Sequence, residues 1–126
     1  MALAVQGVPR ATQDLEVWVD PTQENAERVW QALSRFGAPL KDMHVDRADF
    51  VRPDTVVQIG LPPNRIDLLT AITGVASFEA AWRERVETDI DGHLIPFLGR
   101  ETLIANKRAI GRLKDLADVE ALGEDV

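Results

Sequence analysis

Short apolar runs with a two-residue period alternate along the chain with longer segments whose apolar side chains recur at helical spacing. The two-residue runs are rich in Val, Ile and aromatic residues, and they predict strands at residues 15–19, 55–61, 65–69, 86–90 and 94–98. Capping and turn signals bound the other segments, and they predict helices from Thr22 to Phe36 and at residues 78–85, 100–110 and 114–122.

The segments between these elements carry the turn chemistry that connects them. Pro62-Pro63-Asn64 and Asp91-Gly92 each join two predicted strands closely enough to form an antiparallel hairpin, and the second is a type I′ signal. Residues 40–54 are polar, so we expect a loop with a short helical turn at 46–50. Residues 1–6 are apolar and are expected to be the tail of a helix that Gly7-Val8-Pro9 breaks.

The order of elements is strand, helix, hairpin, helix, hairpin and two helices. This order predicts the α+β class, with a small mixed, largely antiparallel sheet flanked by helices. The length of 126 residues is that of one domain with an adequate core, so residues 1–126 are expected to form a single domain.

Composition and charge narrow the classes of function. The chain has no cysteine and two histidines, so thiolate and His-rich metal sites are excluded. No apolar run approaches the roughly 20 residues that span a bilayer, and a net charge of −7 argues against a duplex-DNA binder. We expect a soluble, cytoplasmic protein without a membrane partner.

Two acids, Asp14 and Glu16, lie one residue apart in the first predicted strand. Side chains two apart on a strand point to the same face, which here also carries Trp18. The alternative is the solvated face of an edge strand, but such a face would rarely carry Trp. Two like charges on one face also repel each other unless a cation lies between them.

A third acid, Asp67, interrupts another apolar strand and shares its predicted face with Arg65 and Leu69. An exposed position on an amphipathic strand is the alternative. Mg²⁺ prefers oxygen ligands and needs few carboxylates when substrate phosphates complete its shell. Asp14, Glu16 and Asp67 are therefore the candidate ligands of a Mg²⁺ site that handles nucleotide phosphates.

The basic residues gather near the C-terminus, at Lys107, Arg108, Arg112 and Lys114. They are interpreted either as cations that face the C-terminal dipole of a helix or as a clamp for a triphosphate. Asp115 and Asp118 lie three apart on one side of the last predicted helix, and Asp115 is also placed as an ordinary first-turn acid. The acids at positions 87, 89 and 91 are expected to form a solvated strand edge.

Four segments together resemble the nucleotidyltransferase superfamily, which has the polymerase-β-like fold. Within it, the chain is similar to small bacterial proteins related to the nucleotidyltransferase toxins of abortive-infection and toxin–antitoxin systems. The segments are ALAVQGVPRATQDLEVWVDP, QIGLPPNRIDLLT, IPFLG and LIANKRAIGRLKDLADVEAL.

The resemblance implies roles for six residues. Asp14 and Glu16 would be the paired metal ligands, and Asp67 the third carboxylate and the base for an incoming hydroxyl. The residues expected near the nucleotide are Lys107 as a phosphate contact, with Asp115 and Asp118 as neighbouring acids.

The chain departs from the superfamily pattern at its start. The superfamily places a Gly-Gly or Gly-Ser turn upstream of the acid pair, where a helix N-terminus holds the nucleotide phosphates. Gly7 is followed by Val8-Pro9 and is no substitute, so the chain is expected to lack that turn and the strand before it. Glu16 also stands where aspartate is commoner.

Two functions remain open on this pattern. One is a Mg²⁺-dependent enzyme that moves a nucleoside monophosphate from NTP to a hydroxyl on RNA, a protein or a small molecule. The other is a catalytically weakened binding module, either one component of a toxin–antitoxin pair or a homodimer. The retained acids favour the enzyme, and the missing turn favours the module.

Overall fold

The computed structural model describes residues 1–5, 15–61 and 65–123. The chain divides into two compact units: the first comprises Met1–Ala2 and Gln13–Ala71, and the second Leu3–Thr12 and Ile72–Val126. Three features predicted from the sequence lie outside the described residues, namely Asp14, the break at residues 7–9 and the turn at residues 62–64.

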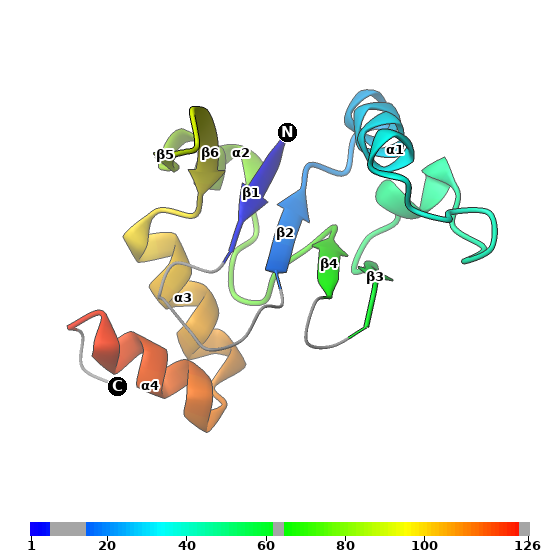
Figure 1. The fold of residues 1–126 in the computed structure, drawn as a ribbon. Helices are drawn as coiled ribbons and strands as arrows, with labels where there is room; N and C mark the ends of the chain where they lie inside the picture. The colour runs from blue at the N-terminus through cyan, green and yellow to red at the C-terminus, as the bar shows by residue number, and fades with distance from the viewer. Residues whose placement is uncertain (6–14, 62–64, 124–126) are drawn as a thin grey trace. The chain divides into compact units, whose positions relative to one another are not determined.

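Strands of the first unit are β2 (Leu15–Val19), β3 (Val56–Ile59) and β4 (Ile66–Leu69). They neighbour one another in the order β3-β4-β2 (Figure 1). The β3–β4 pair is antiparallel and the β2–β4 pair is parallel. The predicted strands and the predicted hairpin are therefore confirmed.

The helical segments of the first unit are α1 (Gln23–Phe36) and the 3₁₀ turn η1 (Arg47–Phe50). The Thr22 hydroxyl caps α1 by accepting from the backbone N–H of Asn25 at 3.1 Å. Gly37 ends α1 with a left-handed φ of 91°, a conformation that glycine adopts at low cost. Both elements agree with the sequence prediction.

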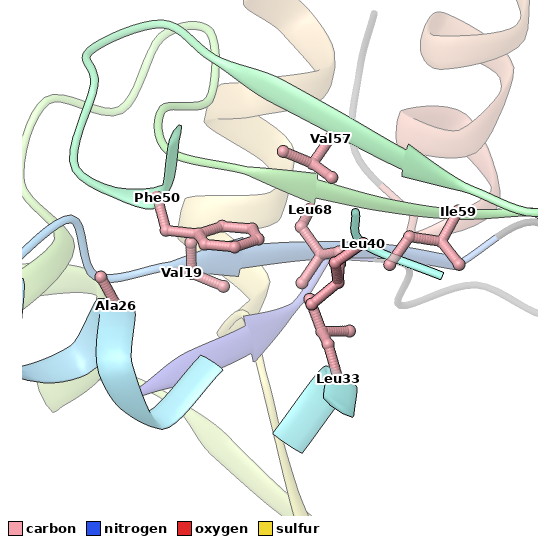
Figure 2. Packing of buried hydrophobic residues seen from close by; sticks show 8 residues of the cluster. All are labelled: Val19, Ala26, Leu33, Leu40, Phe50, Val57, Ile59 and Leu68. Atoms are coloured by element: carbon pink, nitrogen blue, oxygen red, sulfur yellow. The ribbon is translucent and has the colours of Figure 1, made fainter. Parts of the chain in front are cut away.

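One face of these strands forms an apolar core with α1 and the segment that follows it. Figure 2 shows Val19, Val57 and Leu68 from the strands beside Ala26 of α1 and Phe50 of η1. Because successive side chains on a strand alternate between faces, this packing turns the polar positions of β2, β3 and β4 to the opposite face. Glu16 and Asp67 lie on that opposite face.

The second unit contains Leu3 and Ala4 of β1 (Ala2–Ala4), together with β5 (Val86–Ile90) and β6 (His93–Phe97). These strands neighbour one another in the order β1-β6-β5. The pair β5–β6 is antiparallel, and β1–β6 is parallel. Asp91 and Gly92 join the hairpin with φ angles of 53° and 83°, as a type I′ turn requires. Every residue of β5 is exposed, which confirms the predicted solvated strand.

The expectation that residues 1–6 end a helix is wrong for Ala2–Ala4, which form β1. Ala4 lies opposite Phe97 of β6, and its carbonyl accepts from the Leu98 N–H at 2.9 Å. Ala and Leu favour helices intrinsically, but pairing with a distant strand outweighs so weak a preference in three residues.

Helices of the second unit are α2 (Phe78–Arg83), α3 (Arg100–Ile110) and α4 (Leu113–Ala121). Their positions agree with the predicted helices. Each unit combines helices with parallel and antiparallel strand pairs, so the α+β class with mixed pairing is confirmed. Among the helices of the described residues, none has the length and apolar character to cross a bilayer.

Candidate functional site

Glu16 and Asp67 lie directly side by side on the parallel strands β2 and β4. Neighbouring strands are about 4.8 Å apart, and residues in register point to the same face. On its other side Asp67 is opposite Gln58 of β3, so the three residues form a polar row across the strands. The structure thus brings two of the predicted metal ligands together.

The face that carries this row is not a simple solvated surface. Trp18, two residues after Glu16, is only 2% exposed, and its indole N–H donates to the Thr70 carbonyl at 3.3 Å. Asp67 is 7% exposed and Glu16 is half-buried. The alternative of an exposed position is therefore wrong for Asp67.

Asp67 forms an ion pair with Arg65. The Arg65 Nε lies 2.9 Å from Oδ1 of Asp67, and its Nη2 donates to Oδ2 at 3.3 Å. The Arg65 carbonyl also accepts from the Leu15 N–H at 2.9 Å, which fixes the start of β4 beside the start of β2. The hydrogen bond from Nη2 and the close charge contact of Nε together fix the orientation of the Asp67 carboxylate.

Two of the described residues have side chains that can bind a divalent cation. Glu16 and Asp67 supply hard oxygen ligands on one face, and Asp14, the third predicted ligand, lies outside those residues. Within residues 1–5, 15–61 and 65–123, no group of three acids, histidines or cysteines is arranged to hold a metal ion. A metal at Glu16 and Asp67 therefore needs a further ligand from Asp14, water or substrate.

The second group of candidate residues is a buried charge cluster between α3 and α4. Lys107 Nζ lies 3.1 Å from Oδ2 of Asp118 and 3.6 Å from Oδ1 of Asp115. The Lys107 side chain is 9% exposed, and Asp115 is fully buried. Of the three residues predicted to lie near the nucleotide, Lys107 thus contacts both acids.

Arg112 completes this cluster at the turn between the two helices. Its Nε lies 2.6 Å from Oδ2 of Asp115, and its Nη2 donates to Oδ1 at 3.3 Å. Burial by itself would raise the pKa of Asp115. The hydrogen bonds and charge of Arg112, with the charge of Lys107, outweigh burial and lower the pKa of Asp115 below its usual value.

The cluster joins α3 to α4 through charges that balance. Two cations, Lys107 and Arg112, face two carboxylates, Asp115 and Asp118. Lys107 therefore has acidic partners on the next helix, which neither the helix-dipole nor the triphosphate interpretation anticipated. A phosphate contact by Lys107 stays a prediction, and the phosphate would have to approach an ammonium that already faces two carboxylates.

The two groups of candidate residues belong to different compact units. Glu16 and Asp67 lie in the first unit, and Lys107, Asp115 and Asp118 lie in the second.

Sequence reasoning missed the role of both arginines. Arg65 precedes Asp67 by two residues, and strand parity already placed the two on one face. Arg112 precedes Asp115 by three residues at a helix start, a spacing that allows a side-chain pair across the first turn. In both cases the spacing was a usable signal for an ion pair.

Comparisons with known proteins identify no relative of this chain. No family model, no curated protein and no solved structure gives a significant match to the chain.

Proposed function

We propose that the protein is a Mg²⁺-dependent nucleotidyltransferase with a nucleotidyltransferase-like fold. The observation that carries the proposal is the register of β2 and β4, which puts Glu16 beside Asp67 on one face. The resemblance of the four sequence segments to the superfamily supports it independently of that register. The substrate would be an NTP, with a hydroxyl on RNA, a protein or a small molecule as acceptor.

The chain's residues suit the chemistry of this reaction. Glu16 and Asp67, with Asp14, would hold the cation, which when bound supplies positive charge against the triphosphate. Asp67 would take the proton of the acceptor hydroxyl as the hydroxyl oxygen bonds to the α-phosphorus. The bond from that phosphorus to the pyrophosphate oxygen then breaks, and pyrophosphate leaves. Positioning and charge stabilisation supply most of the catalysis.

A binding module is the second candidate, as a toxin–antitoxin component or a homodimer. The observation in its favour is that two charges assigned to catalysis have protein partners, Asp67 with Arg65 and Lys107 with Asp118. In a module these pairs would serve stability alone. The enzyme proposal instead requires that a cation bind Asp67 either beside the Arg65 guanidinium or in its place.

A thermal-shift measurement separates the two candidates. Mg²⁺ together with NTP should raise the melting temperature of the wild-type protein, because ligand binding to the folded state stabilises it. Glu16→Gln should abolish that rise, since it removes a ligand charge without breaking an ion pair found within the described residues.

Glu101→Gln is the matched control, because Glu101 is an exposed acid of α3 in the other unit and no ion pair found within the described residues uses it. The control should keep the full ligand-dependent rise. If wild type shows no rise with any of the four NTPs and Mg²⁺, the enzyme proposal is wrong and the binding module is favoured.

A further inference from the structure

Arg65 occupies both carboxylate oxygens of Asp67 at once. Nε contacts Oδ1 at 2.9 Å and Nη2 contacts Oδ2 at 3.3 Å, and the Arg65 side chain is 29% exposed. Each carboxylate oxygen has lone pairs beyond the one that faces the guanidinium, but a cation bound there is repelled by the nearby positive charge of Arg65, which favours displacement of the guanidinium. The partial exposure of Arg65 gives its side chain room to move without leaving the surface.

The charge balance around Asp67 changes sign when a divalent cation arrives. Among the described residues of this group, Glu16 and Asp67 carry two negative charges and Arg65 one positive charge, a balance that attracts a cation. With a divalent ion added, the same group carries an excess positive charge and attracts an anion. In the Lys107 cluster, by contrast, the ion pairs of the described residues join two cations to two carboxylates.

We propose that Arg65 is an exchangeable counter-ion that holds Asp67 in place until a divalent cation binds, and then contacts a phosphate of the NTP. This inference rests on the proposed function and assigns the phosphate contact to a residue that the sequence interpretation left without a role. The planar guanidinium suits it, because its paired N–H groups match a carboxylate and a phosphate equally well.

Titration with Mn²⁺, followed by electron paramagnetic resonance of the free ion, tests the first half of the proposal. Arg65→Gln should bind Mn²⁺ about ten-fold more tightly than wild type, because the ion no longer competes with a charge-assisted pair. Arg52→Gln is the matched control, since it removes the exposed pair between Arg52 and Asp49 in the same unit. The control should bind Mn²⁺ as wild type does.

ATP binding in saturating Mn²⁺ tests the second half. Arg65→Gln should weaken ATP binding about ten-fold, and Arg65→Lys should restore only part of it, because lysine keeps the charge but lacks the paired geometry. A wild-type sample labelled at its arginine nitrogens provides a measurement that no folding defect can obscure. Adding Mg²⁺ should shift the Arg65 Nε–H resonance.

The outcomes separate this inference from the proposed function. Equal Mn²⁺ affinity of wild type and Arg65→Gln, or an Arg65 resonance unmoved at saturating Mg²⁺, overturns the exchange but leaves the enzyme standing. Unchanged ATP affinity in Arg65→Gln overturns the phosphate contact. Absence of Mn²⁺ binding by every variant overturns both proposals.

Discussion

Replacing Lys107 by methionine should destabilise the protein strongly. Methionine keeps most of the length and the apolar stem of lysine but removes the ammonium that contacts Asp118 and Asp115. Asp115 would keep its pair with Arg112, whereas Asp118 would lose the Lys107 contact at 3.1 Å. The cost should therefore come mainly from the loss of this ammonium contact at a largely buried carboxylate.

The expected size of this loss follows from the burial of the pair. Side chains of Lys107 and Asp118 are 9% and 11% exposed, so solvent screens their interaction little. Removing one partner of a buried pair costs about 3 kcal/mol. Domains of this kind are stable by roughly 5–15 kcal/mol, so the loss is a large fraction of the total.

Urea unfolding followed by circular dichroism measures the effect. With a slope of about 2 kcal/mol per M, the Lys107→Met midpoint should fall by roughly 1.5 M. Lys114→Met makes the same chemical change at an exposed position of α4 and should shift the free energy of unfolding by less than about 0.5 kcal/mol. A double-mutant cycle with Asp118→Asn should return a coupling of about 1–3 kcal/mol. Equal stability of Lys107→Met and Lys114→Met would refute the reasoning.

Three further substitutions test the local structure by urea unfolding. Arg112 lowers the pKa of Asp115, so the stability that Asp115 contributes is present above a pH of about 4 and is lost as the pH falls through the lowered pKa. The Asp115→Asn variant should therefore lose less stability on acidification than the wild-type protein. Equal losses in the two proteins would contradict this. Thr22→Ala removes the α1 cap and should cost about 1 kcal/mol, whereas no change would mean that the hydroxyl contributes nothing. Gly74 has a φ of 80°, and a Cβ there would lie 2.4 Å from the Cβ of Ala109, so Gly74→Ala should lower the free energy of unfolding by about 2 kcal/mol. An unchanged free energy of unfolding would show that α3 shifts to accommodate the added methyl group at little cost.

The sequence predicted the elements whose signals are local. Thr22 and Gly37 mark the ends of α1, and the Asp91-Gly92 pair sets the β5–β6 hairpin. It failed at Ala2–Ala4, because three apolar residues carry no period and their strand forms only by pairing with β6. The parallel β2–β4 pairing is likewise a long-range contact that no local pattern specifies.

The candidate site could be predicted in its residues but not in its ion pairs. Strand parity placed Glu16 and Asp67 on polar faces, and the register then put them side by side. The pairing of Lys107 with Asp118 depends on how α4 packs against α3. The positions of Lys107 and Asp118 along their own helices do not specify that packing, so the sequence did not identify Asp118 as the partner of Lys107.

Anomalous diffraction from crystals grown with Mn²⁺ and a non-hydrolysable NTP tests the central claim most directly. We predict a manganese peak coordinated by carboxylate oxygens of both Glu16 and Asp67, the two residues that β2 and β4 hold in register. A saturated crystal with no peak at this pair, and with Arg65 still contacting both oxygens of Asp67, would contradict the claim.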